Sequence, residues 1–262
     1  MSKTYSLSGE IKTEFYRIIV SPRTYFAVVC VIAVLFLNAR MNGIFKENDT
    51  VYYLSAVLFN HIDLLLILCA ALPFSTLFLD DWKHQYALLA IGRSGYKAYA
   101  GAKVIACFTG GWLVSFLGIH VFLGLLSLKI PFIGQQYEGS LWAGYSALGS
   151  SEFPYLYVFV IVSVLAAGYA FWAVLGLMIS SYCTNMFMTI GLTVILAFYM
   201  INVITPTWPG LINISLIGRG GDLGLGVWGN FFYSIFFLML LSLCAGILFY
   251  RRVKRRVSGE IH

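Results

Sequence analysis

Few residues of this chain have the types and spacing that enzyme chemistry requires. A zinc peptidase needs HExxH, an α/β-hydrolase needs GxSxG together with a histidine, and an ATPase P-loop needs GxxxxGK[ST]. None of these patterns occurs in the 262 residues, and glycine-rich places such as Gly220-Gly221 are not followed by Lys-Ser or Lys-Thr. Asp80-Asp81 is a carboxylate pair without neighbouring metal ligands. We therefore predict no catalytic residue, no metal site and no ATPase site on this chain.

Three ionisable residues within or beside apolar stretches need an explanation. Arg40 and Asp63 each lie seventeen positions from the charge that bounds their own stretch, Arg23 and Asp80. At about 1.5 Å per residue, both would reach a depth of about 25 Å in an antiparallel hairpin, near the outer edge of the hydrocarbon. We expect Arg40 and Asp63 to pair there as a clamp, or to extend to headgroups. His120 could relay protons, but a lone imidazole is more often a satisfied polar group.

These residues must be positioned by apolar elements, because the chain is 60% hydrophobic and 11% charged. That composition leaves too little polar surface to cover a soluble globule. A hydrocarbon core about 30 Å thick takes about 20 apolar residues in a helix. We predict an all-α membrane protein, a single transmembrane domain over residues 1–262, with spans at 24–45, 60–79, 104–128, 154–181, 185–204 and 227–250. Five or seven spans stay open, because the turn at residues 181–184 carries no charge.

The distribution of Lys and Arg predicts that both termini are cytoplasmic, because cytoplasmic loops carry the excess of positive charge. One side would hold only Arg40, Lys46, Lys129 and Arg219, while the rest of the seventeen cations lie before span one, after span two and in the basic tail 251–262. The net charge of +6 thus reflects topology and attraction to anionic headgroups. We predict a multi-pass protein of the cell membrane that binds no nucleic acid.

Residues 1–21 carry an amphipathic pattern. Leu7, Ile11, Phe15 and Ile18 recur at helical spacing, which predicts a cytoplasmic amphipathic helix lying at the membrane interface. Ser21-Pro22 then supplies an N-cap and a proline at the first position of span one.

A second pattern follows span two. The run from Asp80 to Leu89 predicts a short cytoplasmic helix with Trp82, Tyr86 and Leu89 on one face, closed by Gly92 and Gly95. That face either lies on the membrane surface or docks on a partner protein, and the pattern leaves both open.

With these features the chain resembles the permease subunits of type-2 ABC exporters, over the whole six-span layout. The residues that carry the resemblance are the helix from Glu10 to Val20, the entry Ser21-Pro22-Arg23, and the loop from Asp81 to Lys103. In that loop Asp81 matches the family's acid, Leu89 a leucine, Lys97 an arginine and Ala102-Lys103 a Gly-Lys pair. Gln85-Tyr86 replaces Gly-Thr, and a proline of the family's pattern is missing.

The resemblance implies that the loop is a coupling helix seated in a separate ATPase subunit, whose dimer binds ATP and Mg. The implied coupling residues are Asp81, Trp82, Lys83, His84, Gln85, Tyr86 and Leu89, with Trp82, Tyr86 and Leu89 as anchors. It also implies a second permease copy, as a homodimer or a similar heterodimer, with spans two and five lining the cavity between the copies.

The candidate cavity residues on those two spans are Phe74, Phe78, Met188, Leu192, Phe198 and Tyr199. Soft Met and Phe walls suit varied amphipathic substrates, so we expect export of a peptide, toxin or drug. A lipid or lipid-linked glycan is the alternative cargo. An ion-coupled secondary carrier is a further alternative, but it needs charged residues along the pathway, and the interiors of the spans are almost free of charge.

Proline and glycine add three expectations. Pro73 should kink span two, with Ser75 and Thr76 satisfying the freed carbonyls. Small residues should mark close helix packing, either within one subunit or between two copies, at Gly111, Gly118, Gly168 and Gly176. The apolar piece within 205–226 should lie in the outer interface or dip into it, and the resemblance implies that it serves as a gate or lid above the cavity exit.

Overall fold

The computed structural model describes residues 7–41, 49–58, 62–132, 143–149 and 154–259. In these residues the secondary structure is helical and contains no strand. Six helical stretches are long and apolar enough to cross a membrane, which confirms the predicted number. They are α2 (Pro22–Met41), α4 with α5 (Asp63–Ser75 and Leu77–Lys83), α6 (Tyr86–Ser127), α8 (Pro154–Ser180), α9 (Met186–Tyr199, extended by a π-helical turn at Met200–Ile204) and α11 (Gly226–Val257).

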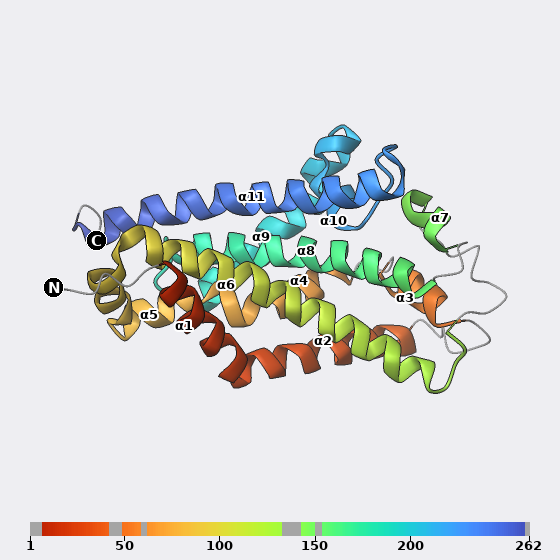
Figure 1. The fold of residues 1–262 in the computed structure, drawn as a ribbon, viewed down its shortest axis with the longest axis horizontal. Helices are drawn as coiled ribbons and strands as arrows, with labels where there is room; N and C mark the ends of the chain where they lie inside the picture. The colour runs from red at the N-terminus through yellow and green to blue at the C-terminus, as the bar shows by residue number, and fades with distance from the viewer. Residues whose placement is uncertain (1–6, 42–48, 59–61, 133–142, 150–153, 260–262) are drawn as a thin grey trace.

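The long helices form an elongated bundle with two distinct ends (Figure 1). The start of α1 (Leu7–Val20), α5 and the end of α11 lie at one end, which we call the terminal end. The short helices α3 (Thr50–Leu58) and α7 (Ser146–Gly149) lie at the other, which we call the loop end. A further short helix, α10 (Ile214–Gly218), packs on α8 and α11.

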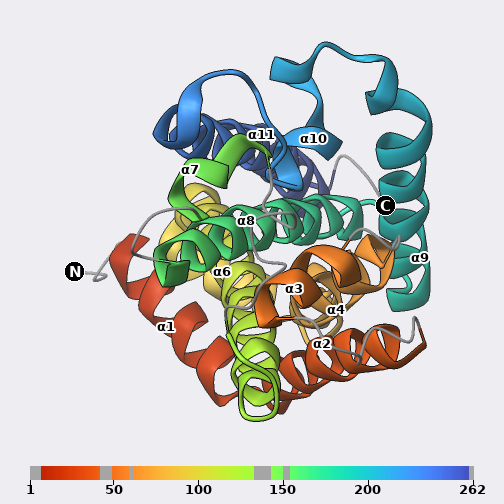
Figure 2. The same cartoon turned by 90° about the vertical axis from the view of Figure 1, so that its right-hand side faces the viewer.

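Helix α8 is the centre of the bundle, surrounded by α4, α6 and α11 (Figure 2). In its apolar window 89% of the residues are buried. Small residues permit the close approach: a Cβ added to Gly111 of α6 would lie 3.1 Å from the Cβ of Ala173. Gly118, Gly168 and Gly176 likewise face other helices of this chain. Packing within one chain therefore accounts for the predicted glycines.

Span two is interrupted, but at Thr76 rather than at Pro73, which lies inside α4. Helix α4 ends at Ser75, and α5 begins after Thr76, whose φ and ψ are −93° and −2°. The expectation that Ser75 and Thr76 satisfy freed carbonyls is wrong, because both hydroxyls are buried and have no hydrogen-bond partner among the described residues.

Helix α1 is present, but its buried face differs from the predicted apolar one. Glu10, Glu14 and Ile18 face inward, and α1 packs on α6. Leu7 is exposed, as are Tyr16 and Ile19. Glu14 turns inward because it pairs with Lys103 of α6.

The connection between spans two and three contains two corners rather than one continuous helix. Helix α5 stops at Lys83, and Gln85 adopts the left-handed conformation, with φ of 58°. Gly95 then interrupts α6 with φ of 80° and ψ of 162°, so residues Tyr86–Ser94 form a separate short helix. A positive φ favours glycine because it has no Cβ. Gly95 thus closes the short helix as predicted, whereas its start lies at Tyr86 instead of Asp80.

Candidate functional site

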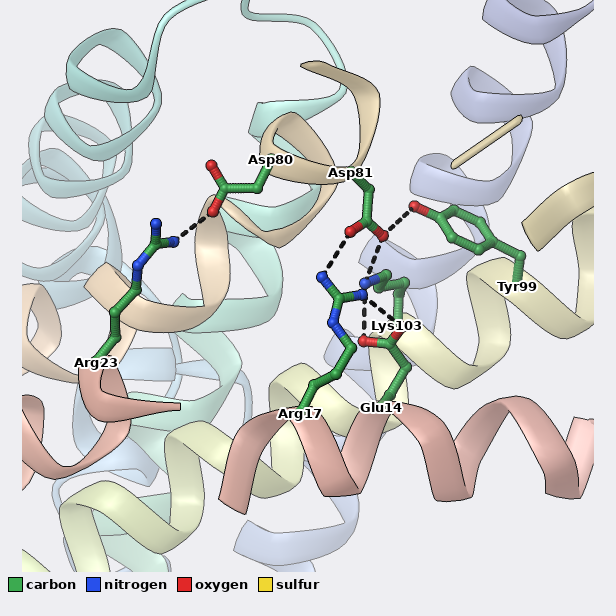
Figure 3. A network of polar contacts seen from close by, with 7 residues as sticks. All are labelled: Glu14, Arg17, Arg23, Asp80, Asp81, Tyr99 and Lys103. Carbon is green, nitrogen blue, oxygen red and sulfur yellow. Dashed lines mark hydrogen bonds and ion pairs between the residues drawn. The ribbon is translucent and has the colours of Figure 1, made fainter. Parts of the chain in front are cut away.

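Five side chains from three helices form a buried network at the terminal end, which we call the charge cluster (Figure 3). Lys103 Nζ lies 2.8 Å from Glu14 Oε2 and 2.6 Å from Asp81 Oδ2. Arg17 donates to Glu14 at 3.0 Å and to Asp81 at 2.8 Å. The Tyr99 hydroxyl donates to Asp81 Oδ2 at 2.9 Å. The cluster thereby joins α1, α5 and α6.

The cluster is electrically balanced, with two carboxylates opposite an ammonium and a guanidinium. Glu14, Asp81 and Lys103 are each at most 2% exposed, so removing any one charge would leave the remaining buried charges unbalanced. Burial disfavours the charged form of Arg17, but Asp81 and Glu14 outweigh it and hold the pKa of the guanidinium above its usual range.

Two aromatic rings next to the charge cluster each contact an arginine guanidinium. The Arg17 guanidinium lies 5.0 Å from the centre of the Tyr86 ring. From the end of α11, the guanidinium of Arg256 lies 4.6 Å from the centre of the Trp82 ring. Both rings are half-buried. Such cation–π contacts add attraction and bring α11 against α5.

The predicted coupling residues divide into two groups. Asp81 is buried in the charge cluster, and Trp82 and Tyr86 are half-buried under Arg256 and Arg17. The others are exposed: Lys83, His84, Gln85 and Leu89. Leu88, which the sequence did not single out, is also exposed, at 45%, beside Leu89 at 67%. The outward apolar surface is therefore the Leu88–Leu89 pair.

The structure buries Glu14 and Lys103, neither of which was predicted from the sequence to lie in the interior. A signal was available: Glu10, Glu14 and Ile18 recur every four residues, so two acids share one face of α1. Lys103 had no such signal, because nothing in its neighbourhood distinguishes it from the exposed Lys97.

The expected pair of Arg40 and Asp63 is wrong. Asp63 Oδ2 accepts a hydrogen bond from Arg219 Nε at 2.6 Å, and Oδ1 accepts one from the Tyr169 hydroxyl at 3.1 Å. The buried stripe of α2 includes Leu35 and Ala39, and Arg40 follows Ala39 by one position. It is therefore rotated away from the bundle and exposed.

The candidate cavity residues also fall into a buried group and an exposed group. Phe74 and Phe78 are 1% and 0% exposed, so they belong to the interior of the bundle and their assignment to a cavity is wrong. On α9, by contrast, an outward face is exposed at Met188, Leu192, Phe198 and Tyr199. This helix lies at the edge of the bundle (Figure 2), with only Thr189, Thr193 and Ala197 buried.

His120 makes a local contact: its Nδ1 lies 2.9 Å from the carbonyl oxygen of Phe116. That carbonyl can only accept, so Nδ1 carries the proton. Among the described residues, no group of three or more His, Cys, Asp or Glu is arranged to hold a metal ion.

Comparison of the chain with models of known protein families, with curated proteins and with solved structures found no match. The fold and the site define a helical protein with six candidate membrane spans and a charge cluster at one end.

Proposed function

We propose that this chain is the transmembrane subunit of an ATP-driven exporter of the type-2 ABC kind, with the terminal end in the cytoplasm. The observation that carries the proposal is the contact of Asp81 with Lys103, 2.6 Å apart. These are the acid and the lysine through which the loop resembles that family, and the helix before span one supplies their partners. Residues that define the resemblance in sequence thus form one unit in the fold.

This unit provides a route for force from a moving partner. The charge cluster links α5 to α1 and α6, and separating the three helices would leave buried charges unpaired. The Tyr86–Ser94 helix projects from this unit between two corners. A push on it is transmitted to α5 and to the interruption of span two at Thr76.

The docking face of the proposed ATPase contact is Leu88 and Leu89 with the exposed Arg93. Trp82 and Tyr86 face inward instead, against Arg256 and Arg17. An apolar centre with a basic rim fits an apolar cleft with carboxylates around it, which is the chemistry we assign to the ATPase subunit.

The transport pathway lies between two copies of the chain in this proposal. The exposed apolar face of α9 forms its wall, with Met188, Leu192, Phe198 and Tyr199. Flexible and aromatic side chains adapt to amphipathic or hydrophobic cargo such as a peptide or drug. The short helix α10, which packs against α8 at Gly168, covers the exit in this proposal.

The test is coexpression with a candidate ABC ATPase subunit, followed by copurification and reconstitution. The wild-type chain should retain the ATPase and stimulate ATP hydrolysis in the presence of candidate peptides or drugs. Leu89→Asp should reduce copurification about tenfold or more, because a charge would enter an apolar contact. The matched control is Leu128→Asp, also at an exposed leucine, but at the end of α6 away from this site. Equal loss in both variants, or no stimulation of any ATPase by the wild type, would contradict the proposal.

A further inference from the structure

A cleft of about 270 Å³ lies at the elbow between α1 and α2. One wall comes from α1 and α2, and the other from α4 and α5. The lining residues are Arg17, Ile18, Ser21, Arg23 and Thr24 on the first wall, and Pro73, Phe74, Leu77, Asp80 and His84 on the second.

The polarity of the cleft changes along span two. His84 and Asp80 line it towards the terminal end, whereas Leu77, Phe74 and Pro73 line it deeper in the span. This change takes place over roughly 16 Å at 1.5 Å per helical residue. A phospholipid has the same sequence of polarity, from its headgroup to its acyl chains.

Hydrogen-bond donors remain free at the polar part of the cleft. Arg23 uses Nη1 in an ion pair with Asp80, and its other N–H groups have no partner within the described part of the chain. The same holds for the Ser21 hydroxyl and the His84 ring. A guanidinium, a hydroxyl and an imidazole are suited to phosphate oxygens.

The charges of the lining residues favour an anion. Arg17 and Arg23 contribute two positive charges, and Asp80 contributes the one carboxylate among the lining residues. Glu14 and Asp81 point into the charge cluster on the other side of Arg17, as Figure 3 shows. The lining residues alone therefore carry one more cation than carboxylate, although Glu14 and Asp81 share Arg17 with the cleft.

The cleft also lies at the level of the membrane boundary. Helix α2, the first candidate span, begins at Pro22, directly beside Ser21 and Arg23. Tyr25, Phe26 and Val29 follow and are about 60% exposed. Arginine beside a row of lipid-facing aromatic residues is typical of the headgroup region.

We propose that this cleft is a binding site for an anionic phospholipid. The lipid phosphate contacts Arg23, Ser21 and His84, and the upper part of one acyl chain covers the partly exposed Leu77. The volume is too small for a whole lipid, so the chains continue along the exposed face of α2. The bound lipid thereby connects the α1–α2 elbow to α5, in addition to the direct contacts between them. This site does not depend on the exporter assignment.

The experiment is native mass spectrometry of the purified full chain, titrated with phosphatidylglycerol, with phosphatidylcholine of the same chains, or with inorganic phosphate. We expect retention of phosphatidylglycerol in preference to phosphatidylcholine. Arg23→Gln should weaken that retention about tenfold, the loss of a charge-assisted contact. Asp80→Asn removes the competing carboxylate and should strengthen it. Arg251→Gln is the control, since Arg251 is an exposed cation of the terminal end outside the cleft.

The two charge variants separate a ligand site from a structural ion pair. If Arg23 and Asp80 served only each other, both substitutions would lower the thermal stability and neither would change lipid retention selectively. That result would overturn the proposal, as would equal loss of lipid in Arg251→Gln. Binding of inorganic phosphate as tightly as phosphatidylglycerol would also overturn it, because the acyl chain would then contribute nothing. Opposite effects of Arg23→Gln and Asp80→Asn on retention would support it.

Discussion

Lys103 carries its charge without any exposed surface, and it can do so because Glu14 and Asp81 lie at 2.8 Å and 2.6 Å. Taking two such charges out of water is costly, and their attraction recovers the cost only when each remaining lone pair or proton has a partner. Tyr99 and Arg17 supply those partners here. The cluster is therefore sensitive to removal of one member.

Lys103→Met should destabilise the protein by about 3–5 kcal/mol, because Glu14 and Asp81 would then share Arg17 alone. The loss of stability is measured as the apparent melting temperature of the purified protein in detergent, monitored through the loss of the monodisperse peak. Lys97→Met is the matched control on the same helix, since Lys97 is exposed. A similar loss in both variants would mean that the buried pairing contributes nothing special.

A second residue-scale prediction concerns Asp63. Asp63→Asn should weaken the attachment of Arg219, which directly follows α10, because the amide cannot replace the charge-assisted contact at 2.6 Å. With the native cysteines replaced, a cysteine introduced at Ser215 should then react several-fold faster with maleimide. Arg40→Gln serves as control and should leave the rate unchanged, since Arg40 is exposed. A faster reaction in Arg40→Gln would indicate that Asp63 pairs with Arg40, which contradicts the structure.

Single residues also mark the limit of what the sequence could predict. Counting positions from the membrane boundary gave Arg40 and Asp63 the same depth, but depth leaves the direction around the helix axis open. Because Arg40 follows the buried Ala39 by one position, its side chain is rotated away from the bundle and cannot pair with Asp63. Arg219 lies 156 positions from Asp63, and no local pattern could have connected them.

At the scale of elements, the number of spans was predictable, because a run of apolar residues must match the hydrocarbon thickness. Helix α8 also begins and ends within a few residues of the predicted span, whereas α6 and α11 extend well beyond theirs at the terminal end. Pro73 predicted a kink in span two, but the interruption lies three residues later, at Thr76. The left-handed Gln85 was not predictable, because glycine or asparagine is the usual residue there. The corners at Gln85 and Gly95 together set the direction of the Tyr86–Ser94 helix.

Gly95→Ala should destabilise the protein by about 1–3 kcal/mol, since φ of 80° with ψ of 162° is a conformation that a Cβ makes costly. No heavy atom lies within 4 Å of the added Cβ, so the effect would come from the backbone alone. Gly92→Ala is the control: its surroundings are equally open and its φ is not positive. That change should be neutral or stabilising, by up to about 1 kcal/mol. Melting temperatures that fall alike in both variants would contradict this account.

The whole molecule is organised around α8, and hydrophobicity alone could not show it. Lipid is as apolar as a protein core, so an apolar side chain reports only that it avoids water. Helix α8 differs from α9 in burial, 89% against 22% of the apolar window, although their mean hydropathies are 2.4 and 2.1. Small residues such as Ala170 and Ala173, rather than greater hydrophobicity, permit the central position.

The final prediction concerns orientation. Six spans place α1 and the end of α11 on the same side of the membrane, and the exposed basic residues of this end should hold it in the cytoplasm. In a cysteine-free background, a membrane-impermeant maleimide should label Ser146→Cys, in α7 at the loop end, in intact cells. Ser258→Cys, after α11, should be labelled only once the membrane is opened. Both serines are exposed, so accessibility to water is matched and the membrane alone separates the two results. Labelling of Ser258→Cys in intact cells would show that the terminal end faces outward. That result would contradict the cytoplasmic contact that the exporter proposal requires, without affecting the fold or the charge cluster.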